Sequence, residues 1–111
     1  MASHFHDTAA AAAFWPQKMN KVNLYESPLL FCDVYCLEPG QSQSEHAHDG
    51  SDKIYHGLTG TCQVRIGDEV RPLSAGQVAV APAGVVHGVH NESDGRATLL
   101  VVMAPHPSFK G

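Results

Sequence analysis

Residues 76–91 read GQVAVAPAGVVHGVHN, and this stretch decides how the chain folds. Proline and glycine at positions 82 and 84 mark a tight turn, because proline presets one turn dihedral and glycine accepts backbone angles that other residues avoid. The apolar runs on either side, Val78–Ala81 and Val85–His90, have the length and β-branched content of short strands. The stretch therefore predicts a strand that ends in a tight turn, which delivers His87 back toward the preceding part of the chain.

The chain repeats this pattern of short strands between turn signals from residue 22 onward. Further strands are expected at Leu29–Leu37, Lys53–Thr59, Thr61–Ile66, Glu69–Leu73 and Ala97–Met103. The last of these is apolar without alternation, as in a strand that is covered on both faces. Many short strands with regular turn spacing predict an all-β sandwich or barrel, and periodicity alone does not choose between the two.

Length and charge exclude several classes of protein. The 111 residues suffice for one domain of ordinary size, and the net charge of −4 argues against a nucleic-acid-binding surface. No apolar run approaches the ~18 residues of a membrane helix, and the start of the chain lacks the charged and apolar regions of a secretory signal. We therefore expect a cytoplasmic protein that binds neither nucleic acid nor a membrane.

The three cysteines are expected to be free, buried thiols. Cys32 and Cys36 lie in one strand-like run, which would hold them about 13 Å apart at ~3.3 Å per residue. A disulfide requires Cα atoms within about 7 Å, so this pair cannot close. Either thiol could meet Cys62 across strands, but free cysteines are commonly buried as small apolar groups.

Residues 1–20 differ in composition from the rest and are expected to form an N-terminal arm, followed by the β domain at 21–111. Asp7 and Thr8 could cap a short helix over Ala9–Ala13. Phe14 and Trp15 are too large and apolar to remain in water, so the arm is expected to pack on the barrel or on a second subunit. Unpaired strand edges also favour association, and we expect a homodimer.

Histidine is the conspicuous residue of this sequence, with eight copies against seven lysines and arginines. His46 and His48 are two residues apart, so on an extended segment both imidazoles point to one face and could approach one ion. The predicted turn brings His87 toward this pair. His90 should face away from His87 by alternation, and His56 and His106 are expected at the surface.

These residues match two motifs of a known family. Gly40, five residues, and then His46-Ala47-His48 resemble the start of the first cupin motif, whose closing glycine corresponds to Gly60. Residues 76–91, quoted above, are similar to the second cupin motif at every fixed position. The resemblance implies a small antiparallel β-barrel, also described as a jelly roll or double-stranded β-helix, with a metal inside its mouth held by His46, His48 and His87.

The first motif departs from the family at its acidic ligand. The position of the usual glutamate holds Lys53, whose ammonium has no electron pair to donate to a cation. Asp52 could replace the glutamate, although a slip of one residue turns a strand side chain to the opposite face unless a bulge intervenes. Three neutral imidazoles would then form the ligand set, with the remaining positions open to water or substrate.

Lys53 has three interpretations. It could lean outward and pair with Glu45 or Asp52, point inward and hold the carboxylate or enolate of a substrate, or act as a base after desolvation. Tyr55 shares the face of Lys53 by alternation, so it could offer its phenol to a substrate or simply fill the core. Gly57, on the same face, would leave room near the metal or mark a kink in the strand.

The resemblance implies a divalent metal cofactor and a small-molecule substrate. Imidazole ligands suit iron, nickel, zinc and copper, with manganese as a further candidate, and iron is the first expectation because some cupin dioxygenases hold iron with three histidines. The function expected first is an oxidoreductase of dioxygenase type acting on a small acid or diketone-like molecule, with Lys53 and Tyr55 as its candidate catalytic residues. A non-catalytic binding module or sensor, and an isomerase or decarboxylase on the same scaffold, remain alternatives.

Overall fold

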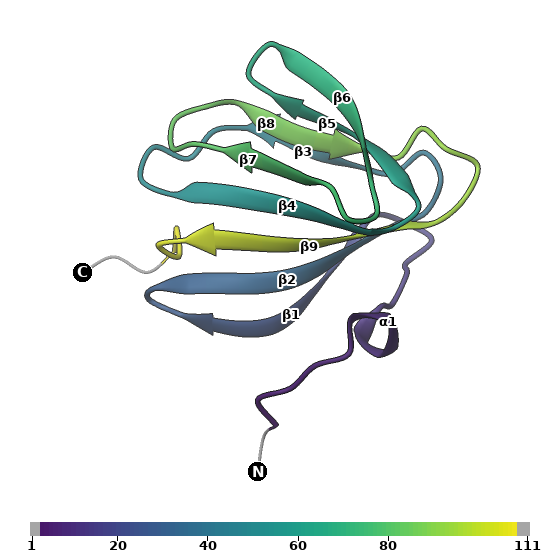
Figure 1. Ribbon diagram of the computed structural model, residues 1–111, viewed down its shortest axis with the longest axis horizontal. Helices are drawn as coiled ribbons and strands as arrows, with labels where there is room; N and C mark the ends of the chain where they lie inside the picture. Colours follow the sequence, from purple (N-terminus) through teal and green to yellow (C-terminus); the bar gives the residue numbers. More distant parts are fainter. Residues whose placement is uncertain (1–2, 109–111) are drawn as a thin grey trace.

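The computed structural model describes residues 3–108 as one short helix followed by nine strands (Figure 1). Residues 1–2 and 109–111, at the outer ends of the expected arm and β domain, lie outside the described residues. In chain order the elements are α1 (Thr8–Ala11), β1 (Asn20–Ser27), β2 (Leu30–Leu37), β3 (Ser42–His46), β4 (Asp52–Thr59), β5 (Thr61–Ile66), β6 (Glu69–Ser74), β7 (Val78–Ala81), β8 (His87–His90) and β9 (Ala97–Ala104).

The strands form two antiparallel sheets that face each other, so the all-β prediction is confirmed. One sheet has the order β1-β2-β9-β4-β7, and the other has the order β3-β8-β5-β6. Strands β5 and β7 have the predicted bounds, and most of the others differ by a residue or two. Strands β1 and β3 were not predicted, because their sequences are largely polar and carry little of the β-branched, alternating signal on which the prediction relied.

The core lies between the two sheets and is built by period-two alternation. Leu99, Val101 and Met103 of β9 are buried, each with at most 1% of its surface exposed, and they face the opposite sheet. Leu100 and Val102 of the same strand are only half-buried on the outer face. The outer face of β9, the strand that runs across the middle of its sheet (Figure 1), is therefore covered less fully than the inner face, so the prediction of a strand covered on both faces holds only in part.

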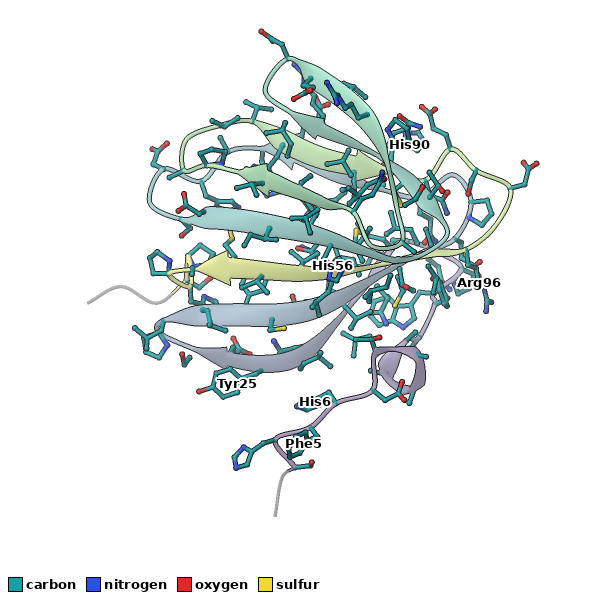
Figure 2. All side chains as sticks on the ribbon, in the orientation of Figure 1. Phe5, His6, Tyr25, His56, His90 and Arg96 are labelled. Atoms are coloured by element: carbon teal, nitrogen blue, oxygen red, sulfur yellow. The ribbon has the colours of Figure 1, made fainter. Side chains whose placement is uncertain are left out.

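The N-terminal arm is tied to the barrel by hydrogen bonds. Asp7 caps α1 by accepting from the amides of Ala9 and Ala10, and the helix begins at Thr8 and ends at Ala11, two residues earlier than predicted. The Asn20 side chain donates to the Ala13 carbonyl at 2.9 Å, and the Gln41 side chain donates to the Trp15 carbonyl at 2.7 Å. These contacts hold the segment between α1 and β1 against the barrel, whereas Phe5 projects into solvent and is 88% exposed (Figure 2).

Two smaller expectations are also settled. All three cysteines are free thiols, with Cys36 and Cys62 buried and Cys32 half-buried. His106 is not a surface residue: only 9% of it is exposed, and its Nε2 lies 2.9 Å from a carboxylate oxygen of Glu26. Within residues 3–108, no helix has the length and apolar character needed to cross a membrane.

Gly57 permits a close approach between β4 and the turn after β6. Its amide donates to the Gln77 carbonyl at 2.9 Å, and its carbonyl accepts from the Gly76 amide at 3.0 Å. A Cβ at position 57 would collide with the backbone carbonyl of Ser74. The expectation that Gly57 leaves room beside the metal is therefore wrong, because backbone fills the space.

Replacing Gly57 with alanine is expected to destabilise the barrel by about 1–3 kcal/mol, since the collision is with backbone and can be relieved only by separating the two segments. Urea denaturation of Gly57→Ala measures this loss. Gly50→Ala is the matched control, because a Cβ at position 50 meets no atom within 4 Å. Equal midpoints for the two variants would contradict the close approach.

Candidate metal centre

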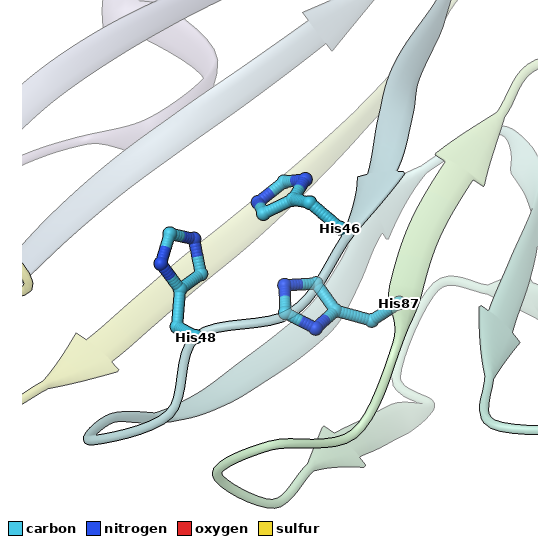
Figure 3. Close-up of side chains that lie close together, drawn as sticks. All are labelled: His46, His48 and His87. Atoms are coloured by element: carbon cyan, nitrogen blue, oxygen red, sulfur yellow. The ribbon is translucent and has the colours of Figure 1, made fainter.

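Strands β3 and β8 bring three histidines together at one end of the barrel (Figure 3). His46 pairs directly with His87 across the two strands, so both rings leave the sheet on its inner face. His48 follows in the loop after β3, and its carbonyl accepts from the Gly84 amide at 2.8 Å, which ties this loop to the turn before β8. One ring nitrogen from each histidine lies within 4.8 Å of the others.

Backbone carbonyls select which nitrogen of two rings is available. Nδ1 of His46 lies 2.7 Å from the Ser44 carbonyl, and Nδ1 of His87 lies 2.9 Å from the Val85 carbonyl. A carbonyl oxygen only accepts, so each Nδ1 carries the proton and each Nε2 keeps its lone pair. Metal-binding histidines are oriented in this way by a partner on the second nitrogen.

The residues present fit a divalent metal ion. Nε2 of His87 is a buried atom with no hydrogen-bond partner among residues 3–108, which is costly unless a ligand completes it. Burial lowers the pKa of His87 and also that of His48, so both rings are in the neutral form that binds metals. Nitrogens on one tetrahedral ion lie about 3.4 Å apart for bonds of about 2.1 Å, so small rotations of the half-buried rings of His46 and His48 would close the site.

No carboxylate joins this cluster within the described part of the chain. The side chain of Asp52 is exposed, and its Oδ1 accepts from the Ala83 amide at 2.8 Å. The alternative in which Asp52 replaces the missing glutamate is therefore wrong, because this aspartate stands on the outer side of β4, as the alternation of side chains requires.

Lys53 points inward and is only 1% exposed. Its Nζ lies 3.4 Å from Oε1 of Gln43 and about equally far from two rings, at 5.3 Å from the centroid of Tyr35 and 5.2 Å from that of Tyr55. The outward alternative, an ion pair with Glu45 or Asp52, is wrong, since Glu45 instead pairs with Arg65 at 3.1 Å.

Burial has a large effect on the protonation of Lys53. Desolvation, reinforced by the positive charge of Lys21 and opposed by the negative charge of Asp33, lowers the pKa of Lys53 from 10.5 to about 7. Near neutral pH the amine is therefore present in both its protonated and its neutral form. It can act either as a cation that binds an anion or as a neutral amine.

A buried polar network surrounds Lys53. Tyr55 is fully buried and donates its phenolic proton to Oε1 of Gln43 at 3.0 Å, while the Gln43 amide donates to the hydroxyl of Tyr35 at 3.2 Å. Burial raises the pKa of both tyrosines, so both remain neutral donors. Gln43 was not predicted from the sequence, because it lies three residues before His46 and simple alternation would place the two on opposite faces; the register shift between them restores a common face.

The remaining histidines stay outside the cluster. His90, three residues after His87, is exposed as predicted, and Figure 2 shows it at the edge of the molecule. His56 is half-buried on the opposite face of β4 from Tyr55.

Comparison with known proteins settles the family. The family model for the cupin domain matches residues 33–103, which include the three clustered histidines, Lys53 and Tyr55. The chain belongs to the cupin family. The resemblance found in the two sequence motifs is thus confirmed, together with the fold that it implied.

Several known proteins are similar over most of the chain. A structure from Thermus thermophilus superposes with a TM-score of 0.92 at 46% identity, over 95% of this chain and 100% of that one. An uncharacterized protein of Streptomyces coelicolor is 31% identical over 65% of this chain and 68% of its own length. A protein of Streptomyces cyaneus named polyketide synthase CurC is 31% identical over 71% of this chain, but the match spans only 53% of that longer protein.

Replacing Lys53 with methionine is expected to stabilise this cupin in its metal-free form at neutral and low pH. Each pKa unit corresponds to about 1.4 kcal/mol, so charging the buried amine costs on the order of several kcal/mol below pH 7. The unfolded chain binds the proton more tightly, so this cost fades as the pH rises from about 7 to 10.5. Urea midpoints of Lys53→Met and the native chain, measured with chelator from pH 6 to 10, should therefore differ most at pH 6.

The control for this experiment is Arg71→Met, which removes an exposed cation whose ion pair with Glu69 is on the surface. Its effect should be small and independent of pH. A stability difference between Lys53→Met and the native chain that does not change with pH would contradict the depressed pKa of Lys53.

Proposed function

We propose that this cupin binds one divalent metal ion through His46, His48 and His87 and uses it for oxidoreductase chemistry of dioxygenase type. The observation that carries the proposal is the buried, partnerless Nε2 of His87 among residues 3–108, which lies in a cluster of three imidazoles. Iron is the metal proposed first, and nickel, zinc, manganese and copper are alternatives with compatible ligands. When bound, the metal would supply open positions at which an oxygen-bearing substrate could chelate it and dioxygen could be activated.

The protein's own residues would bind and orient the substrate. Lys53, protonated, would hold the negative charge of a carboxylate or enolate, and its position is set by the Oε1 of Gln43. Tyr55 fixes that oxygen by donating to it, and it brings its ring to 6.1 Å from the ring of His87. Because no carboxylate joins the ligand set among the described residues, the ligands would not offset the charge of a divalent ion, and the site would favour an anionic substrate.

The substrate class proposed is a small acid or a diketone-like molecule, since either can chelate a metal through two oxygens. The name of the Streptomyces cyaneus relative, polyketide synthase, supports the second class, because polyketides carry carbonyl groups on alternate carbons.

Metal analysis of protein purified without added metal tests the binding step. The native chain is expected to retain close to one ion per chain, and His87→Ala should lose it because a three-ligand site cannot spare a ligand. His90→Ala, on the same strand but exposed, is the matched control and should retain metal. Protein that rejects iron, nickel and zinc alike would contradict the proposal and favour a metal-free binding module.

Oxygen uptake by the iron-loaded chain, measured on a panel of small 2-oxo acids and 1,3-diketones, tests the dioxygenase step. Uptake that disappears in His87→Ala supports it. Stoichiometric iron without uptake on any member of the panel would retain the metal site and overturn the dioxygenase assignment.

We also propose that the chain forms a homodimer through the outer face of the five-stranded sheet. Ile54 pairs with Val80 and His56 with Val78 in adjacent strands, so the three apolar side chains share this face, and each is at least 40% exposed. Such a patch is typical of an interface. Sedimentation equilibrium should give a dimer for the native chain and a monomer for Val80→Asp, and a native monomer would contradict the proposal.

A further inference from the structure

A groove between the edge strands β1 and β3 reaches His46 of the histidine cluster. It has a volume of about 500 Å³, and its lining includes Gln43 and the candidate ligand His46. The N-terminal arm forms one wall through Trp15 and Lys18, and β1 contributes Lys21. The arm is held in this place by the hydrogen bond between Gln41 and the Trp15 carbonyl.

The charge in this groove has the opposite sign to that of the whole chain. The lining residues include two lysines and no carboxylate, whereas the chain has a net charge of −4. The ammonium of Lys18 lies 5.8 Å from the Trp15 ring, and that of Lys21 lies 5.4 Å from the ring of Tyr35. Each lysine therefore lies beside an aromatic ring, Lys18 beside Trp15 and Lys21 beside Tyr35.

Lys21 and Lys53 bring two ammonium groups to one aromatic ring. The Nζ atom of Lys53 lies 5.3 Å from the centroid of the Tyr35 ring, which the Nζ atom of Lys21 also approaches. Protonation of one lysine therefore makes protonation of the other less favourable. Asp33, an acidic group that interacts with both, is largely buried and already accepts from the Asn23 amide at 2.8 Å. An incoming anion would relieve this repulsion without displacing an existing ion pair.

We propose that this groove is the substrate entrance and that Lys21, assisted by Lys18, binds a second carboxylate of the substrate, distant from the end that reaches the histidines. The proposal rests on the proposed function and narrows its substrate class to an organic acid with one chelating end and one distal carboxylate. In this arrangement Trp15 covers the part of the substrate between its two ends, and Lys53 binds the charge at the chelating end.

Two probes that differ only in the distal carboxylate test this inference: 2-oxoglutarate and 2-oxopentanoate. The protein is loaded with zinc, which binds substrate oxygens but has no redox chemistry, so no turnover interferes. Trp15 is the single tryptophan of the chain and lines the groove, so its fluorescence reports binding there. We expect 2-oxoglutarate to bind about tenfold more tightly, as for a charge-assisted hydrogen bond in a partly exposed site.

Variants at position 21 separate the proposed contact from general effects. Lys21→Met should abolish the preference for 2-oxoglutarate while leaving the affinity for 2-oxopentanoate and the zinc content unchanged. Lys21→Arg should retain the preference, and Arg71→Met, which removes a cation from the far edge strand β6, should not alter it. Equal affinity of the two acids for the native chain, or equal weakening of both by Lys21→Met, would overturn the inference.

A metal-free measurement distinguishes failure of the groove from failure of the metal site. Glutarate and its uncharged diamide are titrated against the apo chain, where no chelation occurs. The anion site is supported if Trp15 fluorescence changes with glutarate but not with the diamide, and if this change is lost in Lys21→Met. This result would stand even if the chain takes up no zinc and the proposed function fails. If the chain takes up zinc but its fluorescence does not change with glutarate, the proposed anion site in the groove is overturned and the metal site is retained.

Discussion

Two backbone carbonyls determine what this end of the barrel can do. By accepting from Nδ1 of His46 and His87, the carbonyls of Ser44 and Val85 fix both rings and leave each Nε2 free. The pairing of β3 with β8 then sets the two rings opposite each other, and the loop that carries His48 is tied to the turn at Gly84. The chain's own contacts therefore orient the rings of His46 and His87, so binding a metal would require little reordering of these two ligands.

Replacing an acidic ligand by a lysine changes the charge of the whole interior. A glutamate beside three imidazoles would cancel part of the charge of a divalent ion, whereas Lys53 adds to it whenever it is protonated. Burial opposes that protonation and lowers the pKa of Lys53 to about 7. An anionic ligand would remove the conflict, since it would offset the ion and the ammonium together. Lys18 and Lys21 in the groove also favour anions, so the preference for an anionic ligand reaches from the interior to the surface, although the chain as a whole is acidic.

Local patterns predicted the parts of the structure that depend on spacing, and not those that depend on packing across strands. The histidine trio follows from two short motifs, and alternation along β4 correctly grouped Lys53 with Tyr55. Whether that face was inside could not be read from the residues, because a lysine is ordinarily exposed and only its neighbours in space explain its burial. Gln43 and strand β1 were missed for related reasons: a register shift hides the first, and a polar sequence hides the second.

The most direct test of this account is a crystal structure of the zinc-loaded protein, with the metal located by its anomalous scattering. We expect one ion bonded to Nε2 of His46 and His87 and to a ring nitrogen of His48 at about 2.0–2.1 Å, with no carboxylate of the chain among its ligands and Lys53 still inside the barrel. An ion held by Asp52 or bound elsewhere, or rings that remain apart in the presence of excess zinc, would contradict it.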